Sequence, residues 1–204
     1  VRGRWADGWV RVSDLTLRTS DARLDGKVDL QLASMSTRGQ LKLVTPGAQA
    51  QVSGQIAAED GAGDLTLNIT DGATLRRWLA RLPNTPKSLG QFDVSGKSEL
   101  AARWTGGWQS FLQPGRGKPA SLQARLQIPA LALRLDGQSA EQTLRLRDVD
   151  TELGGSLEAL TFKTRAQVSR SGQELQLRAD GRGGRNGRGD WRANIDHLQM
   201  QAKA

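Results

Sequence analysis

Apolar and polar residues alternate along most of this chain, and that alternation restricts its fold more than any other feature. Residues 27–45 read KVDLQLASMSTRGQLKLVT, in which two alternating segments flank a polar turn. Successive side chains of a β-strand point to opposite faces, so each segment predicts a strand with one apolar and one polar face. The same pattern recurs almost to the last residue and predicts a mainly β protein.

The predicted strands follow one another with short polar turns between them. Successive strands usually pair as neighbours, which favours an antiparallel meander over a compact Greek key. We therefore expect an elongated, curled antiparallel sheet, a β-taco with a hydrophobic groove. The predicted strands cover residues 9–18, 27–33, 39–45, 48–58, 63–70, 91–104, 121–135, 142–153, 157–170, 173–180 and 190–202.

One segment has helical spacing and predicts a short helix over about residues 72–82. Asp71 suits the N-cap position, and Pro83 stops the helix. Residues 106–115 indicate a second short helical turn. The apolar stripe of the first helix has the spacing i, i+3, i+4 and i+7 and consists of Leu75, Trp78, Leu79 and Leu82.

The chain has 204 residues, enough for one large β domain or two small ones. The loop QPGRGKP at 113–119 is the best internal boundary that the composition offers. No run of eighteen apolar residues and no signal peptide are visible. We expect residues 1–204 to form a single β-rich segment of a longer protein.

The charge balance is basic but dispersed. There are 29 basic and 21 acidic residues, a net charge of +8, spread along the chain. Such a distribution is typical of solvated sheet faces, with nucleic acid or anionic lipid as the alternative acidic partner. Only 4% of residues are aromatic, which argues against base stacking, so we expect no nucleic-acid partner. The absence of cysteine excludes thiolate chemistry.

No catalytic constellation emerges from the polar residues. His197 is the only histidine and has no ligand or triad partner at a suitable spacing, so a solvated strand histidine is expected. Asp148, Asp150 and Glu152 alternate along one strand about 6.5–7 Å apart, too far to converge on one cation. We expect them to pair with arginines of a neighbouring strand. The sequence predicts no enzyme activity, no metal site and no cofactor.

The segment GRGGRNGRGD at 181–190 contains Arg-Gly repeats and an R-G-D tripeptide. A glycine-rich hairpin explains it more simply than RNA binding or cell adhesion. Asn186 and Gly187 form the pair that a type I′ turn favours, which predicts the turn at these residues.

The apolar face itself is the candidate site. In a β-sandwich a second sheet would cover it, but an aliphatic lining with few aromatics favours an open trough for hydrocarbon chains. Each methylene moved from water into such a trough contributes about 0.8 kcal/mol. Arginines at the rim would meet lipid phosphates. The candidate groove residues are Val28, Leu30, Leu32, Leu41, Leu43, Val52, Ile56, Leu65, Leu67, Ile69, Leu144, Leu146, Leu175 and Leu177, some of which would pack under the helix instead.

The sequence resembles the TamB family, the inner-membrane subunits of the bacterial translocation and assembly module, within the wider AsmA-like group. The resemblance rests on GRWADGWVRVSDLTLRTSDARLDGKVDLQLA (3–33), GQLKLVTPGAQAQVSGQIAAEDGAGDLTLNITDGATLRRWLARLP (39–83) and ELAARWTGGW (99–108). It consists of leucine-alternating strands and glycine turns rather than an invariant motif, and it extends loosely over most of the chain.

The resemblance implies a periplasmic β-taco within a protein anchored in the bacterial inner membrane. Its groove would conduct the acyl chains of phospholipids toward the outer membrane and support outer-membrane biogenesis. An Omp85-family, TamA-like outer-membrane protein would bind through regions outside this segment. The rival hypothesis is a chaperone-like or structural module whose strand edges pair with outer-membrane β-barrel proteins during their assembly.

Overall fold

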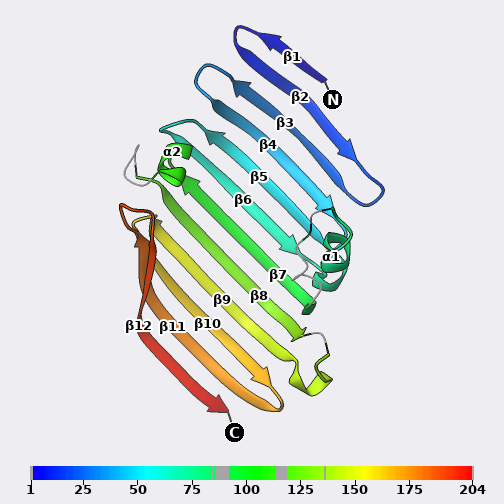
Figure 1. Ribbon diagram of the computed structural model, residues 1–204, viewed down its shortest axis with the longest axis vertical. Helices are drawn as coiled ribbons and strands as arrows, with labels where there is room; N and C mark the ends of the chain where they lie inside the picture. The colour runs from blue at the N-terminus through cyan, green and yellow to red at the C-terminus, as the bar shows by residue number, and fades with distance from the viewer. Residues whose placement is uncertain (1, 84, 86–91, 114–118, 136, 204) are drawn as a thin grey trace.

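The computed structural model describes residues 2–83, 85, 92–113, 119–135 and 137–203, whose strands form one antiparallel sheet (Figure 1). Within these residues the sheet has 12 strands in sequence order and is not closed into a barrel, which confirms the predicted fold class. The strands are β1 Arg2–Ala6, β2 Trp9–Arg18, β3 Arg23–Gln31, β4 Ser36–Thr45, β5 Ala48–Ile56, β6 Gly61–Ile69, β7 Phe92–Thr105, β8 Ser121–Leu135, β9 Leu144–Ser156, β10 Ala159–Arg170, β11 Gln173–Arg185 and β12 Trp191–Lys203.

Short helical segments fill three of the connections between strands. Helix α1 (Gly72–Leu79) joins β6 to β7 and confirms the predicted helix, although it ends at Leu79 rather than near residue 82. Helix α2 (Trp108–Leu112) precedes β8, and the 3₁₀ turn η2 (Ala140–Gln142) precedes β9. The predicted boundary at 113–119 falls mostly on residues outside the described ranges, and the strands on its two sides, β7 and β8, are neighbours in the sheet.

Residues with positive φ close several of the hairpins. Asp7 and Gly8 have φ of 52° and 75°, and Ser171 and Gly172 have φ of 52° and 81°, the pattern of a type I′ turn. The predicted type I′ turn at Asn186 is wrong, because neither Asn186 nor the glycine after it has positive φ. Instead, Asn186 Oδ1 accepts hydrogen bonds from the backbone N–H groups of Arg188 and Asp190 at 2.9 and 3.0 Å.

Several strands differ from their predicted extents: β3 and β4 begin at Arg23 and Ser36 rather than at residues 27 and 39, and β9 ends at Ser156 rather than at residue 153. Strand β11 continues to Arg185, so the first half of the glycine-rich segment belongs to the sheet. Glycine is uncommon in strands, but Gly181 gives the ring of Phe162 room: a Cβ there would lie 2.7 Å from the ring. Strand β1 was not predicted, because its five residues RGRWA are too few to show a clear alternation.

No second layer packs on the sheet in the described part of the chain. The buried apolar side chains there are only Ala120, Leu157 and Leu160. The accessible surface is 13626 Å², whereas a compact protein of this mass exposes about 9,300 Å². The sheet is therefore stabilised by its strand ladders and by contacts between neighbouring side chains, not by a closed core.

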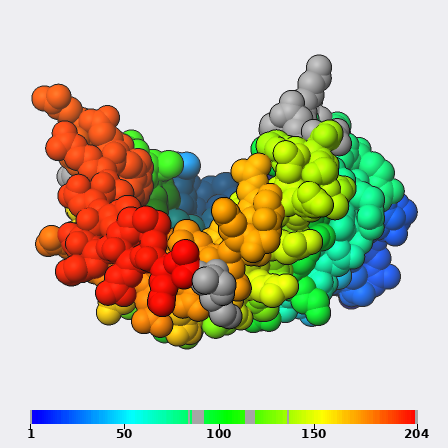
Figure 2. Space-filling model, turned by 90° about the horizontal axis from the view of Figure 1, so that it is seen from below, coloured from blue at the N-terminus to red at the C-terminus, as the bar shows by residue number. Residues whose placement is uncertain are grey.

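The sheet curls into a trough, which Figure 2 shows from below, along the stack of strands. The ends of the strands rise as walls on either side of a hollow. Along β6 and β7 apolar side chains are half-buried while the alternate polar side chains are exposed. Concave curvature crowds side chains and convex curvature separates them, so the apolar side is the inside of the trough. We call it the groove face and the other side the outer face.

Candidate functional site

Cross-strand partners on the groove face form continuous apolar rows, because partners in register point to the same side of a sheet. One row runs from β2 to β12 without a polar side chain. At about 4.8 Å between neighbouring strands, this row is about 48 Å long. Its members are Leu15, Gly26, Leu41, Val52, Leu65, Ala102, Ala124, Leu153, Phe162, Gly181 and Ile195.

The neighbouring row is aliphatic over β2 to β8 and changes character after that. In β9 and β10 it carries Thr151 and Thr164, whose hydroxyl oxygens are 2.6 Å apart, and it is aliphatic again at Ala179 and Leu198. The groove is therefore more strictly hydrocarbon-like in its N-terminal part. The members of this row over β2 to β8 are Leu17, Leu24, Leu43, Ala50, Leu67, Leu100 and Leu126.

The structure brings the candidate residues to the groove face with one exception. Leu32 lies in the turn after β3, where it is 48% exposed and its backbone N–H donates to Gly8 O. The register links the rest across the sheet: Leu41 pairs with Val52 and Leu43 with Ala50. The strand members on this face are Val28, Leu30, Leu41, Leu43, Val52, Ile56, Leu65, Leu67, Ile69, Leu144, Leu146, Leu175 and Leu177.

Two aromatic residues on the groove face, Trp104 and Phe162, are absent from the sequence-based set. Each lies over a glycine of the next strand: a Cβ at Gly63 would be 2.2 Å from the indole of Trp104, and Gly181 accommodates Phe162. The rings therefore lie across the floor and leave the hollow open. Opposed glycine and aromatic residues could have signalled this pairing, but only once the register was known.

Helix α1 lies against the groove face at one side of the trough. Asp71 caps it, accepting from the backbone N–H of Thr74 at 3.1 Å and from its hydroxyl at 2.6 Å, and these bonds lower the pKa of Asp71 below its usual range. A Cβ at Gly72 would lie 3.6 Å from Val94, a groove-face residue of β7. We call this side, where the even-numbered strands end, the α1 rim.

Helix α2 lies at the opposite rim. Its first two backbone N–H groups, those of Trp108 and Gln109, donate to Ala57 O and Ala58 O at 2.9 and 3.0 Å, and an arginine of β11 holds its last turn. Arg185 occupies the groove-face position that follows Gly183 in the alternation, and it is 7% exposed. Its Nη1 donates to Phe111 O at 2.7 Å and its Nη2 donates to Ser110 O. Glu158 lies 3.6 Å from the same guanidinium group. A cation at the carbonyl end of a helix also complements the helix dipole. We call this side the α2 rim.

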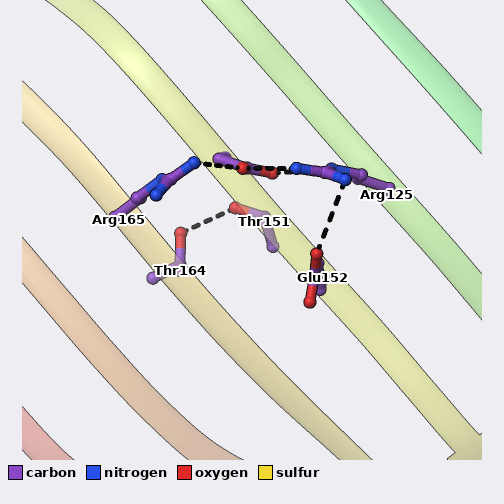
Figure 3. A network of polar contacts seen from close by, with 6 residues as sticks. Arg125, Thr151, Glu152, Thr164 and Arg165 are labelled. Atoms are coloured by element: carbon purple, nitrogen blue, oxygen red, sulfur yellow. Dashed lines mark hydrogen bonds and ion pairs between the residues drawn. The ribbon is translucent and has the colours of Figure 1, made fainter.

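Ion pairs cover the outer face, as expected for the carboxylates of β9. Asp150 lies 2.8 Å from Arg125 and 2.7 Å from Arg165, and Glu152 lies 3.7 Å from Arg125 (Figure 3). The hydrogen bond from Arg125 is the main cause of the lowered pKa of Asp150. The predicted pairing with arginines is confirmed for Asp150 and Glu152, while Asp148 sits at positive φ in a bulge.

The outer face also has shallow hollows between its long side chains. One of about 570 Å³ lies between Asp64, Arg103, Gln123, Arg125 and Lys163. The ion pair of Arg103 with Asp64, at 2.8 Å, already satisfies part of its charge. The lining of this hollow is largely apolar, with Ala101 among the charged side chains, but the hollow is a single shallow one. The apolar rows of the groove face continue across the sheet, so the groove face remains the candidate site.

His197 pairs with Asp180 on the outer face, with Nδ1 and Oδ2 2.9 Å apart. This hydrogen bond raises the pKa of His197 above its usual value of about 6.5. Because the pKa of His197 is higher in the folded state, the pair with Asp180 stabilises the fold fully below a pH of about 6.5. This stabilisation is lost as the pH rises through the folded-state pKa.

We expect Asp180→Asn to return the pKa of His197 toward its usual value in an NMR titration. The signal is unambiguous because the chain has one histidine. An unchanged pKa would show that the pair does not form in solution.

No family model, no curated protein and no solved structure matches this chain. None of the helices in the described residues is long and apolar enough to span a membrane. Among the same residues, no group of three or more His, Cys, Asp or Glu side chains could hold a metal ion. The fold and the site together define an open β-trough with an apolar floor.

Proposed function

We propose that this chain is a non-enzymatic, periplasmic segment of a TamB-like protein of the AsmA group, whose groove conducts phospholipid from the inner to the outer membrane. One observation carries the proposal: the groove face is apolar over almost the whole sheet, and no other layer of the described chain covers it. An uncovered apolar surface of this extent marks a binding site for another apolar surface.

The aliphatic lining suits acyl chains in particular. Leucine, valine and isoleucine side chains impose no stacking geometry, so a flexible hydrocarbon chain can lie along the rows in many registers. Each methylene removed from water contributes about 0.8 kcal/mol, and a few methylenes therefore give useful affinity without a specific contact. Because each contact is weak and equivalent to the next, a chain can also slide along the rows, as a conduit requires.

The resemblance to the TamB family supports the cellular setting of the proposal. The resemblance implies a groove in the periplasm, within a protein anchored in the inner membrane, and an Omp85-family partner that would bind elsewhere on the protein. Neither nucleic acid nor a cofactor is part of the proposal.

Native mass spectrometry of the full chain purified from a bacterial host tests the proposal. We expect complexes heavier than the chain by the mass of one or more phospholipids, released on collisional activation. A chain that is empty and also takes up no lipid from phosphatidylglycerol–phosphatidylcholine vesicles contradicts the proposal. A lipid-free dimer contradicts it as well, because a second copy would then cover the groove.

The chaperone-like alternative is favoured by the sheet edges. Within the described residues, β1 and β12 each pair with a strand on one side only, and the main-chain N–H and C=O groups on the other side could pair with a further strand. On β12, Trp191 and Ile195 are 60% exposed and Met200 is 62% exposed. An extended apolar strand of a β-barrel protein would fit such an edge. Edge pairing depends on the main chain, so it should survive a substitution in the groove that abolishes lipid binding.

A further inference from the structure

Charged side chains are distributed unequally between the two faces. The strand positions on the groove face carry no acidic residue within the described ranges, whereas the outer face carries both signs in ion pairs such as Arg38 with Asp29 and Arg103 with Asp64. The charges that border the groove therefore lie at the strand ends, where they include both arginines and carboxylates such as Asp71 and Glu158, and their arrangement decides where a polar headgroup can lie.

The two rims differ in the cations they offer. At the α2 rim, Arg185 is buried and its guanidinium group is occupied by helix carbonyls, and the hairpin after β11 adds one exposed arginine, Arg188. At the α1 rim, Arg77 and Arg81 of the α1 segment are exposed. Arg170, the exposed last residue of β10, lies at the same ends of the strands and has the groove-face parity of Val168.

Within the described residues, Arg77 and Arg81 make no close ion pair, although the charge of Arg77 contributes to the lowered pKa of Asp71. Arg77 Nη2 donates to the neutral hydroxyl of Thr74 at 2.9 Å, and Arg81 Nε donates to the carbonyl oxygen of Arg77 at 3.3 Å. The nearest carboxylate to Arg81 is Asp21, at 4.0 Å. Two like charges spaced i, i+4 repel each other, so an anion beside both would be favourable.

We propose that the α1 rim binds the headgroup of a phospholipid with net negative charge, with Arg77 and Arg81 contacting the phosphate region while the acyl chains enter the groove. This inference rests on the proposed lipid-binding function and adds an orientation and a headgroup class to it. Charge complementarity favours an anionic over a zwitterionic headgroup, because the two exposed arginines of the α1 segment outnumber its one exposed carboxylate, Asp71.

The test compares phosphatidylglycerol and phosphatidylcholine that carry the same pyrene-labelled acyl chains, each titrated into the full chain at low salt. We expect the parent chain to bind phosphatidylglycerol roughly two- to thirty-fold more tightly, the range for two exposed ion pairs. The double variant Arg77→Gln, Arg81→Gln should lose this preference, because its binding of phosphatidylglycerol should weaken more than its binding of phosphatidylcholine. The matched control is Arg145→Gln, Arg147→Gln, which removes the same charge from the outer face of β9 near the same rim.

Each outcome is informative. Loss of the preference in the α1 variant but not in the control supports the proposal. No preference in the parent chain, or equal loss in both variants, overturns it, because net charge would then explain the selectivity. Failure of the parent chain to bind either lipid refutes the conduit function itself. Because salt screens exposed charges, the preference should also fall between 50 and 500 mM salt, by roughly the same factor as in the α1 variant.

Discussion

Replacing Leu67 with Asp is expected to lower phospholipid occupancy by at least about ten-fold while the chain stays folded. Leu67 lies in the middle of the aliphatic row, between Ala50 and Leu100. A carboxylate there would have to lose water when an acyl chain covers it, and that cost opposes binding. No protein layer covers the site, so the unbound variant keeps its carboxylate hydrated and should lose only about 1–2 kcal/mol of stability.

The neighbouring residue provides the control for this variant. Thr66→Asp adds the same charge one residue earlier on β6 but on the outer face, where Thr66 is exposed and lies opposite the uncharged residues Gln51 and Ala101. It should leave both lipid occupancy and the unfolding midpoint nearly unchanged. If Leu67→Asp unfolds the chain, the leucine row is a structural core and not a conduit. If it folds and binds lipid normally, the acyl chains lie elsewhere.

Replacing Arg185 with Met is expected to destabilise the chain by about 2–4 kcal/mol, because it leaves buried helix carbonyls without their donors. The methionine keeps the apolar stem but cannot donate to Ser110 O or Phe111 O. Helix α2 should detach from the α2 rim first, since its own hydrogen bonds are few. Hydrogen exchange should show faster exchange at Gln113, whose N–H donates to Gln109 O at 2.7 Å.

Arg182→Met is the matched control for this experiment. Arg182 lies three residues earlier in β11, on the outer face, where it is exposed and pairs with Asp196. Its replacement should change the urea midpoint little, because a fully solvated ion pair contributes little to stability. Equal losses from the two variants would mean that Arg185 acts through charge alone and does not hold α2.

The alternation of residues was enough to predict most strands, the antiparallel meander and the face on which Leu41, Leu65 and Leu175 lie. That success has a physical cause: the pleat has a period of two, so local sequence fixes the face without knowledge of the partner strand. Helix α1 was predictable for a similar local reason, since its cap and its apolar spacing lie within a few residues of one another.

The features that the sequence did not reveal depend on contacts between distant residues. In the sequence, Arg185 lies in a glycine-rich segment that predicts a turn. In the structure, its hydrogen-bond partners in α2 are 74 and 75 residues away. The indole of Trp104 can lie across the neighbouring strand β6 because Gly63 has no side chain there. The turn at Asn186 formed differently because its side-chain oxygen bonds two backbone N–H groups, and this replaces the geometry that the Asn-Gly pair alone would favour.

The order of the strands has a consequence for the dimensions of such a protein. Because every strand pairs only with those before and after it in sequence, the trough behaves as a one-dimensional array of hairpins. Inserting or deleting one hairpin would change its reach by two inter-strand steps, roughly 10 Å, without altering its cross-section. In this architecture the number of residues therefore sets the length of the trough, independently of what the groove face binds.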